Sequence, residues 1–302
     1  MKKYGNSEKP KDQATIDSWR RLAGLNDAEA MNNLGVAFHF GDVVPMDQDQ
    51  AVVWWWKAVA KGHAPAMDNL GWAHYGGEGV EEDCAMSFAL WRKAVAKGYP
   101  PAFFSLGVAY RHGLGTDVDP VLAIETWEKG DQADDPASQF SLGQVYEKGD
   151  GKPQNIDLAI KYYTKASLKG NAAAHHQLGV IFDRPSLIQD QPRALYHWQN
   201  AALLDHPRSM VIFGRALYSG LGVPKNEAQA TYFWQRAAEY GDADAKFNLG
   251  LARYKRLNRA TNDGQAVESL WRNAANDGHP KAILALKYWE KGDHRRLQEL
   301  TF

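Results

Sequence analysis

One short pattern returns at an almost constant interval along nearly the whole chain of 302 residues. Each copy contains a hydrophobic residue followed directly by glycine, and successive glycines lie 36, 36, 36, 36, 35 and 36 residues apart. The pairs are Leu34-Gly35, Leu70-Gly71, Leu106-Gly107, Leu142-Gly143, Leu178-Gly179, Phe213-Gly214 and Leu249-Gly250. A fixed period of this length is typical of repeat proteins, in which each unit packs mainly against its two neighbours. The period therefore constrains the fold more than any other feature of the sequence.

Two further registers keep the same phase as the glycines. Later in the same unit, each glycine is followed by an aromatic residue. These residues are Trp55, Trp91, Trp127, Tyr163, Trp198, Trp234 and Trp271, and Trp19 lies one period before Trp55. Except for Trp19, each aromatic residue has an Asp or Asn eight residues before it, namely Asp47, Asp83, Asp119, Asn155, Asp190, Asn226 and Asp263. Because these side chains accept hydrogen bonds from unpaired amides at a helix start, they are predicted N-caps. Each unit is thus predicted to hold an A helix with the glycine and a B helix with the aromatic residue.

Both kinds of helix have predicted ends. The A helices stop at glycine-containing loops such as GGEGV and GLGVP. The B helices stop at Gly62, Gly98, Gly170, Gly241 and Gly278, and at Asp134 and Asp205 in the two remaining units. The fifth and seventh units have DRPSLIQDQ and KRLNRATNDG instead of the glycine loop, so we expect altered turns there. The glycine inside each A helix costs about 1 kcal/mol relative to alanine, so its repetition predicts close approach by the backbone of a neighbouring helix.

These registers resemble the Sel-one-like repeat family, a relative of the tetratricopeptide repeats, over residues 28–279. The resemblance implies an all-α fold, a right-handed α-solenoid or superhelix of helix-turn-helix repeats whose A helices line the concave face. The predicted repeats are 28–63, 64–99, 100–135, 136–171, 172–206, 207–242 and 243–279. Because solenoid ends expose an apolar face, we expect a capping helix at 14–27 and a capping helix with a tail at 280–302. Residues 1–13 are predicted to be a disordered tail.

The composition disfavours several classes of partner. A formal charge of -1 offers no electrostatic basis for binding nucleic acid, although one stretch is locally basic. Its residues are Arg253, Lys255, Arg256 and Arg259, with Arg295 and Arg296. The single cysteine, Cys84, allows no intramolecular disulfide and no cysteine-based metal cluster. Because we find neither the apolar core of a signal peptide nor a run of about 20 apolar residues, we expect a cytoplasmic protein without a membrane partner.

The titratable residues form no recognisable catalytic or metal site. His63, His206 and His279 occupy one repeated position just after the B helix, which favours a role in the turn. His175 and His176 are adjacent, and adjacent helix positions diverge, so we do not expect them to share a metal ion. The glycine loops lack the strand and the Lys-Ser/Thr pair of a phosphate-binding loop. We therefore expect no enzyme activity, no catalytic residue, no cofactor, no metal and no small-molecule substrate.

A binding groove is predicted on the side of the A helices opposite the packing leucine. This side holds the residues two before, two after, five after and six after that leucine. The protein-binding residues predicted from it are Asp68, Trp72, Tyr75, Phe104, Arg111, Phe140, Glu147, His176, Arg215, Tyr218, Phe247 and Tyr254. Exposed aromatic and arginine side chains are typical of binding hot spots, but Phe104, Phe140 and Phe247 can instead pack between repeats. Trp56, on a B helix, is a second candidate contact.

Together these observations predict a non-catalytic interaction solenoid that holds a partner protein in its concave groove. The resemblance implies a module common in bacterial signalling adaptors, host-interaction factors and neutralisers of toxins. The more specific hypothesis is a bacterial immunity or antidote protein that sequesters a toxic effector. The alternative is a regulatory adaptor or scaffold in bacterial signalling or host interaction. Replacing Trp72 and Tyr75, or Arg215 and Tyr218, by alanine is expected to weaken binding and to leave folding intact.

Overall fold

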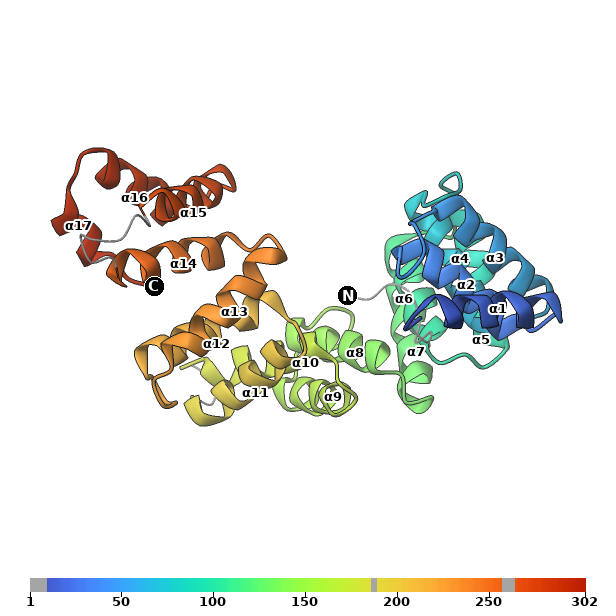
Figure 1. Ribbon diagram of the computed structural model, residues 1–302. Helices are drawn as coiled ribbons and strands as arrows, with labels where there is room; N and C mark the ends of the chain where they lie inside the picture. The colour runs from blue at the N-terminus through green and yellow to red at the C-terminus, as the bar shows by residue number, and fades with distance from the viewer. Residues whose placement is uncertain (1–9, 186–188, 257–263) are drawn as a thin grey trace. The chain divides into compact units, whose positions relative to one another are not determined.

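The computed structural model describes residues 10–185, 189–256 and 264–302, and within these ranges every regular element is a helix (Figure 1). A and B helices alternate along the chain, so the predicted all-α repeat solenoid is confirmed. The chain divides into two compact parts, Met1–Ala166 and Ser167–Phe302, called unit 1 and unit 2 below. The boundary falls inside one helix, α9 (Ile156–Leu168). None of the described helices is long and apolar enough to cross a membrane.

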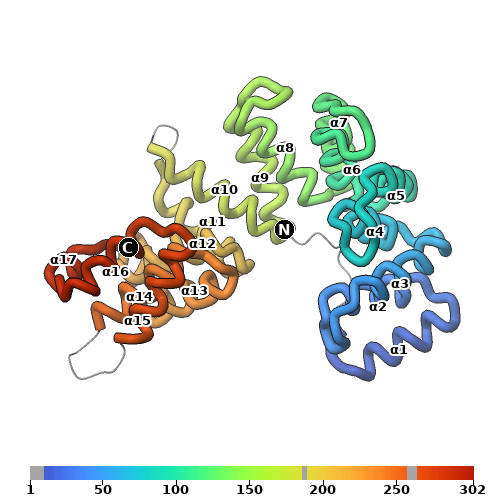
Figure 2. Tube along the Cα trace, turned by 90° about the horizontal axis from the view of Figure 1, so that it is seen from above, coloured from blue at the N-terminus to red at the C-terminus, as the bar shows by residue number. Residues whose placement is uncertain are grey.

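Unit 1 begins with α1 (Gln13–Gly24), which carries Trp19 in the position of a B helix. The A helices that follow are α2 (Ala28–Phe40), α4 (Ala64–Gly76), α6 (Pro101–His112) and α8 (Pro136–Lys148). The B helices are α3 (Gln48–Ala60), α5 (Cys84–Ala96), α7 (Pro120–Gln132) and α9. Helix α2 packs on α3, α4 on α5 and α6 on α7, and these pairs are stacked in sequence order (Figure 2).

Unit 2 repeats the same arrangement and ends with two additional helices. Its A helices are α10 (Ala172–Asp183), α12 (Pro207–Ser219) and α14 (Ala243–Arg256). Its B helices are α11 (Gln191–Leu203), α13 (Glu227–Glu239) and α15 (Gly264–Asn276). The chain then continues with α16 (Pro280–Glu290), which packs on α15, and α17 (His294–Glu299), which packs on α16.

The predicted caps are present wherever the structure describes them. Six of the seven Asp and Asn residues of the cap register accept a hydrogen bond from the amide three residues later, at 2.8 to 3.1 Å. They are Asp47, Asp83, Asp119, Asn155, Asp190 and Asn226. The seventh, Asp263, lies outside the described residues. Asp134 and Asp205, which replace the closing glycine, both adopt positive φ (62°).

The repeated glycine of the A helix faces an aromatic ring of its own repeat. A Cβ atom on Gly35 would lie 2.5 Å from the Trp55 ring, and one on Gly107 would lie 2.1 Å from Nε1 of Trp127. The expected close approach therefore comes from a B-helix side chain and not from a neighbouring backbone. Nε1 of Trp127 also donates to the carbonyl of Phe104, at 3.3 Å. The glycine register and the aromatic register are thus the two sides of one buried contact.

The turns of the fifth and seventh units were expected to differ. In the fifth, α10 ends at Asp183 and Arg184 takes an extended conformation (ψ 115°), where other A helices end at a left-handed glycine such as Gly149. Residues 186–188 of that turn and 257–263 of the seventh lie outside the described residues. So do residues 1–9 of the predicted tail and Arg259 of the basic stretch.

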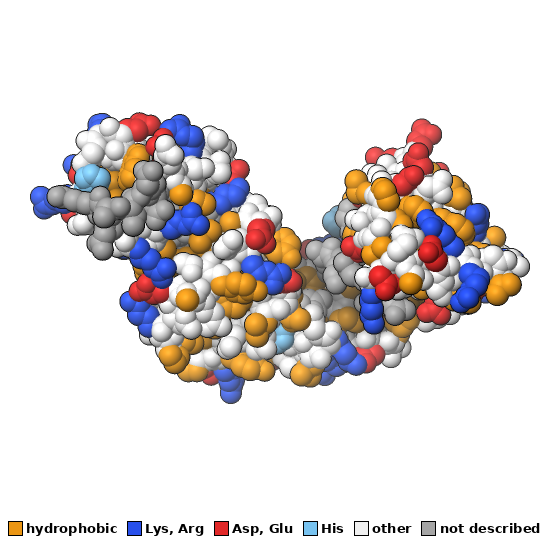
Figure 3. Space-filling view, viewed as in Figure 1, with side chains coloured by type: hydrophobic (Ala, Val, Ile, Leu, Met, Phe, Trp, Pro, Cys, Tyr) orange, Lys and Arg blue, Asp and Glu red, His pale blue; other side chains and the backbone are white. Residues whose placement is uncertain are grey.

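The solvent-exposed hydrophobic side chains are scattered. Figure 3 shows them in small groups separated by charged and polar atoms within each unit. Trp56 on α3 is 38% exposed, and its ring lies 6.0 Å from that of His74. On the face shown in Figure 3, hollows of the surface are therefore better candidates for a binding site than one large apolar patch.

Candidate functional site

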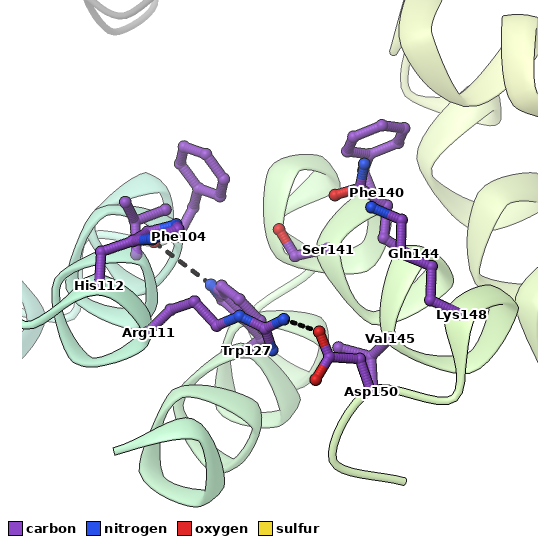
Figure 4. A pocket seen from close by; sticks show the side chains of 11 residues that line it. Phe104, Arg111, His112, Trp127, Phe140, Ser141, Gln144, Val145, Lys148 and Asp150 are labelled. Carbon is purple, nitrogen blue, oxygen red and sulfur yellow. Dashed lines mark hydrogen bonds and ion pairs between the residues drawn. The ribbon is translucent and has the colours of Figure 1, made fainter. Parts of the chain in front are cut away.

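A pocket of about 380 Å³ lies in unit 1 between α6 and α8, the A helices of the third and fourth repeats (Figure 4). Nine of its eleven lining residues come from these two helices, one comes from α7 and one from the loop after α8. The lining residues are Phe104, Val108, Arg111, His112, Trp127, Phe140, Ser141, Gln144, Val145, Lys148 and Asp150.

The geometry of the helices explains why these positions meet. Residues two before and two after the repeated leucine are four apart, and therefore lie above one another on a helix face. Phe104 and Val108 hold these positions on α6, and Phe140 and Gln144 hold them on α8. The structure thus brings together three of the residues predicted to bind protein, Phe104, Arg111 and Phe140, with four others from the same predicted helix face.

The pocket has an apolar floor and a cationic rim. Phe104, Trp127 and Phe140 supply rings to its walls, while Arg111 and Lys148 carry positive charge at its edge. Arg111 reaches from α6 to an ion pair with Asp150, as Figure 4 shows. The other terminal nitrogen of Arg111, Nη1, is buried and has no hydrogen-bond partner among the described residues. The arrangement can take an apolar side chain beside a hydrogen-bond acceptor such as a carboxylate or a carbonyl oxygen.

Two predicted groove residues of the second repeat are buried instead. Asp68 is 2% exposed and Trp72 is 8% exposed. Ser105 Oγ donates to Asp68 Oδ1 at 2.7 Å, and Trp72 Nε1 donates to Ser105 Oγ at 3.1 Å. The Trp72 ring also packs on Trp91, with centroids 5.1 Å apart. Trp72 is thus not an open groove residue, and we expect its truncation to reduce stability.

Glu147 and Tyr75 also belong more to the packing than to an open groove. Glu147 is 8% exposed and accepts a hydrogen bond from the hydroxyl of Tyr163, at 2.8 Å. Tyr75 is partly buried, and its ring meets that of Trp72 edge to face at 5.7 Å. Neither residue lines the α6–α8 pocket.

The predicted protein-binding residues of unit 2 also include both buried and exposed side chains. Phe247 and Tyr254 are buried, so the packing alternative holds for Phe247. His176 is half-buried, with Nδ1 2.8 Å from Ser209 Oγ. Arg215 is exposed, and Tyr218 is partly buried. A second pocket, of about 370 Å³, is lined by Val211, Arg215, Asp244, Phe247, Asn248, His279, Pro280, Lys281 and Phe302.

The burial of these side chains in unit 1 has one physical cause. The face opposite the leucine was treated as solvent-exposed, but α4 contacts α6 and α6 contacts α8. In unit 1, α4 and α6 are therefore each covered by the A helix of the next repeat as well as by their own B helix. Large side chains near the centre of that face, such as Trp72, are enclosed between two A helices, whereas those near its ends, such as Arg111, reach the surface.

Several buried groups have strongly shifted pKa values but do not converge on the pocket. Burial raises the pKa of Asp68 to about 7. Burial, together with the nearby His206 and Arg208, lowers the pKa of His176 to about 4. His63, His206 and His279 are helix N-caps in the turns where they were expected, with Nδ1 accepting an amide hydrogen bond. Among the described residues, no group of three or more His, Cys, Asp or Glu is arranged to hold a metal ion.

Four residues of the pocket were not predicted to line it. Trp127 belongs to the aromatic register of the B helices, and its side chain is 5% exposed and forms part of the pocket wall. Ser141 and Val145 lie next to the predicted helix face. Asp150 follows α8 in the loop GDGKP, and its charge opposite to that of Arg111, about one repeat earlier, is the signal that could have identified it.

A family model described as "Sel1 repeat" matches residues 28–63, 64–99, 100–129, 136–171, 172–206 and 209–242. The chain belongs to the Sel1 repeat family. The matched ranges run from α2 to α13 and include both helices that form the pocket. Sel1 repeat arrays are generally non-catalytic scaffolds, and the architecture is one of protein–protein interaction. Among curated protein sequences, none matches this chain significantly.

Solved structures of several other proteins have a similar fold. A protective antigen of uropathogenic Escherichia coli with an SLR fold is 27% identical (TM-score 0.65) over 90% of this chain, which spans 59% of that protein. A Sel1 repeat protein from Oxalobacter formigenes is 23% identical (TM-score 0.67), with 87% of this chain and 99% of that one covered. An immunity protein from Pseudomonas aeruginosa is 21% identical (TM-score 0.54), with 79% and 85% covered. The last two likenesses concern the fold alone.

Proposed function

We propose that this Sel1 repeat chain is a non-catalytic binding protein that holds a segment of a partner protein in the α6–α8 pocket. The observation that carries the proposal is the apolar floor with a cationic rim between two consecutive A helices. A pocket of this size takes one or two side chains and not a folded domain, so the rest of the partner lies over neighbouring repeats.

The chemistry of the pocket specifies the segment. An apolar side chain of the partner packs against Phe104 and Phe140, while a carboxylate beside it binds Arg111 and Lys148. Arg111 suits this role because its planar guanidinium donates several hydrogen bonds and only one side of it is used by Asp150. Arginine and aromatic side chains are also the groups that contribute most at binding hot spots.

The more specific proposal is a bacterial immunity or antidote protein that sequesters a toxic effector in the cytoplasm. It is supported by the family and by the likeness in fold to an immunity protein from Pseudomonas aeruginosa. A regulatory adaptor or scaffold is the second candidate. The two differ in a measurable way, because an immunity protein must abolish the harm that its partner does to a cell, whereas an adaptor only binds.

The test is to co-express the chain in a bacterial host with the product of the gene next to its own. The immunity proposal expects that product to stop growth alone and the wild-type chain to restore growth. Replacing Arg111 and Lys148 by alanine should weaken the purified complex at least tenfold, because two rim cations are lost. Lys148 is exposed and the Arg111 side chain is 24% exposed, so the melting temperature should fall only by the small amount that the Arg111–Asp150 ion pair contributes.

Trp56→Ala is the matched control, because Trp56 is a large exposed side chain on α3, outside the pocket. It should bind the partner as the wild type does. Loss of binding in Trp56→Ala together with normal binding in the Arg111/Lys148 variant would show that the pocket model is wrong. Binding that depends on the pocket but does not affect growth would favour the adaptor.

A further inference from the structure

In unit 2, the residues after α16 fold back over the A helices. Helix α17 turns the chain so that the end marked C lies beside α14 (Figure 1). The Tyr254 hydroxyl lies 3.2 Å from Nδ1 of His294, and the two rings are parallel to within 7°. Eight residues later, Phe302 lies against Tyr218 of α12, with ring centroids 4.3 Å apart. Tyr218 and Tyr254 both lie four residues after the repeated glycine of their helices. Residues 294–302 therefore contact the same repeat position twice, first on α14 and then on α12.

Phe302 is held as an aromatic anchor. Its ring stacks on Trp234, at 5.1 Å between centroids and 17° between planes. Nζ of Lys255 lies 5.1 Å from the centroid of the Phe302 ring. Nζ of Lys281 donates to the main-chain carbonyl of Thr301, at 2.9 Å. An aromatic side chain held by rings and a cation, with a hydrogen bond to the adjacent main chain, is a general mode of peptide recognition.

The groove continues beyond Phe302. Phe302 borders the second pocket, whose other walls include Arg215, Phe247 and Lys281. Asp244, the one acidic residue of the lining, is already paired with Arg208 and with His279. Arg215 and Lys281 therefore give this part of the groove a positive character. The side chains just before Phe302 are Leu300 and Thr301, so the segment places no acidic side chain next to the ring.

We propose that the groove of α12, α14 and α16 is a second binding site, for an extended peptide segment with an aromatic residue next to an acidic one. The chain's own residues 300–302 occupy part of this site and must be displaced. A tethered segment acts at an effective concentration that reaches the millimolar range, so it suppresses weak ligands and admits one with additional contacts. This site is distinct from the α6–α8 pocket, so either proposal can fail without the other.

The test uses an amidated, fluorescein-labelled peptide with the sequence of residues 297–302. Fluorescence anisotropy should show that the Phe302→Ala chain binds it at least tenfold more tightly than the wild type, because the competing ring is absent. A peptide with the Thr301→Glu change should bind about threefold more tightly again, through the cations of the groove. A peptide with the Phe302→Ala change should bind neither chain. Arg295→Ala, in the same segment but with a side chain that is 91% exposed, should behave as the wild type.

Two further measurements separate a binding site from a structural contact. Adding Tyr218→Ala to the Phe302→Ala chain should weaken peptide binding at least tenfold, because the ring against which Phe302 lies is lost. In the wild-type chain, excess peptide should increase hydrogen exchange in residues 294–302, and this holds even if Phe302→Ala fails to fold. Equal affinity of wild type and Phe302→Ala, or exchange that peptide leaves unchanged, would overturn the proposal.

Discussion

The two units use one position of the repeat in different ways. Four residues after the repeated glycine, the third repeat in unit 1 has Arg111, which borders an open pocket. The corresponding residue of the sixth repeat, in unit 2, is Tyr218, and Phe302 lies against it. The repeat thus determines where a groove can form, while the side chains and the residues after the last repeat decide whether it is open.

The units also differ in the titratable groups that they bury. Unit 1 contains Asp68 and Asp135, and burial raises the pKa of both carboxyl groups. Unit 2 contains the contacting pair His175 and His197 and the stacked pair His176 and His206, and burial lowers the pKa of all four imidazoles. The same backbone position, two before the repeated leucine, is Asp68 in one unit and His176 in the other. Equivalent packing should therefore respond to pH with opposite signs.

The largest effect expected is the same in both units. Trp127→Ala in unit 1 and Trp234→Ala in unit 2 should each lower the free energy of unfolding by about 3–5 kcal/mol, as for large aromatic truncations in cores. Each ring fills the space left by a repeat glycine and donates to an A-helix carbonyl. Urea unfolding measures the loss. An unchanged midpoint in either variant would show that the two registers do not form one contact.

A smaller effect on stability is expected from truncating residues of the predicted groove, and it should differ between a buried and an exposed residue. Trp72→Ala should cost about 3 kcal/mol, because it opens a hole beside Trp91 and removes the hydrogen bond to Ser105. Arg215→Ala, in unit 2, should change stability by less than about 0.5 kcal/mol, because Arg215 is exposed. Thermal unfolding of the two variants compares them directly. Similar stability of both would contradict the burial of the second repeat.

Acidification should change the stability of the two units in opposite directions. A histidine whose pKa is lowered by folding takes up protons more readily when unfolded, so unit 2 should lose stability as the pH falls from 6.5 towards 4. Asp68 takes up protons more readily in the folded protein than in the unfolded one. Its contribution to the stability of unit 1 therefore grows as the pH falls through about 7 and is complete below 3.8. In unit 1, burial lowers the pKa of one histidine as well, His63, which opposes part of this gain. We expect a difference between units of about 2 kcal/mol at pH 5, after allowing for partial exposure of the imidazoles.

Hydrogen exchange measured by mass spectrometry at pH 7 and pH 5 reports each unit separately. Protection, corrected for the intrinsic exchange rate, should fall at pH 5 in α10–α12 relative to α4–α6. Asp68→Asn, which cannot ionise, is the control and should remove most of the contribution from unit 1. An equal loss of protection in both units would show that the buried groups do not control the response.

The smallest effect concerns the two left-handed aspartates. Asp134→Gly in unit 1 should raise stability by up to about 0.5–1 kcal/mol, because glycine adopts positive φ without strain and the hydrogen bond that Gln139 Nε2 donates to Asp134 Oδ1 is long, at 3.3 Å. Asp205→Gly in unit 2 should gain less, because it also removes the ion pair with Arg236, at 2.8 Å. Differential scanning calorimetry can compare the two shifts. A larger gain at Asp205 would mean that this ion pair contributes less than the hydrogen bond between Gln139 and Asp134.

Much of the fold was predictable because its signals are local and repeated. A helix cap such as Asp119 needs only the amide three residues away, and a closing glycine needs only its own backbone angles. The phase of the glycine and aromatic registers added the pairing of A and B helices. These features belong to segments shorter than one repeat, so the sequence by itself determined the family and the order of the helices.

The exposure of individual side chains was decided only by the tertiary structure. Helical periodicity places Trp72 and Val108 on the same face of their A helices, but it does not say how closely the next A helix covers that face. Whether Trp72 is buried depends on Ser105, and whether Arg111 borders a pocket depends on α8 and Asp150. The return of Phe302 to Tyr218 joins residues 84 positions apart and follows no repeat spacing. Such contacts depend on packing between segments, and no local pattern in the sequence specifies them.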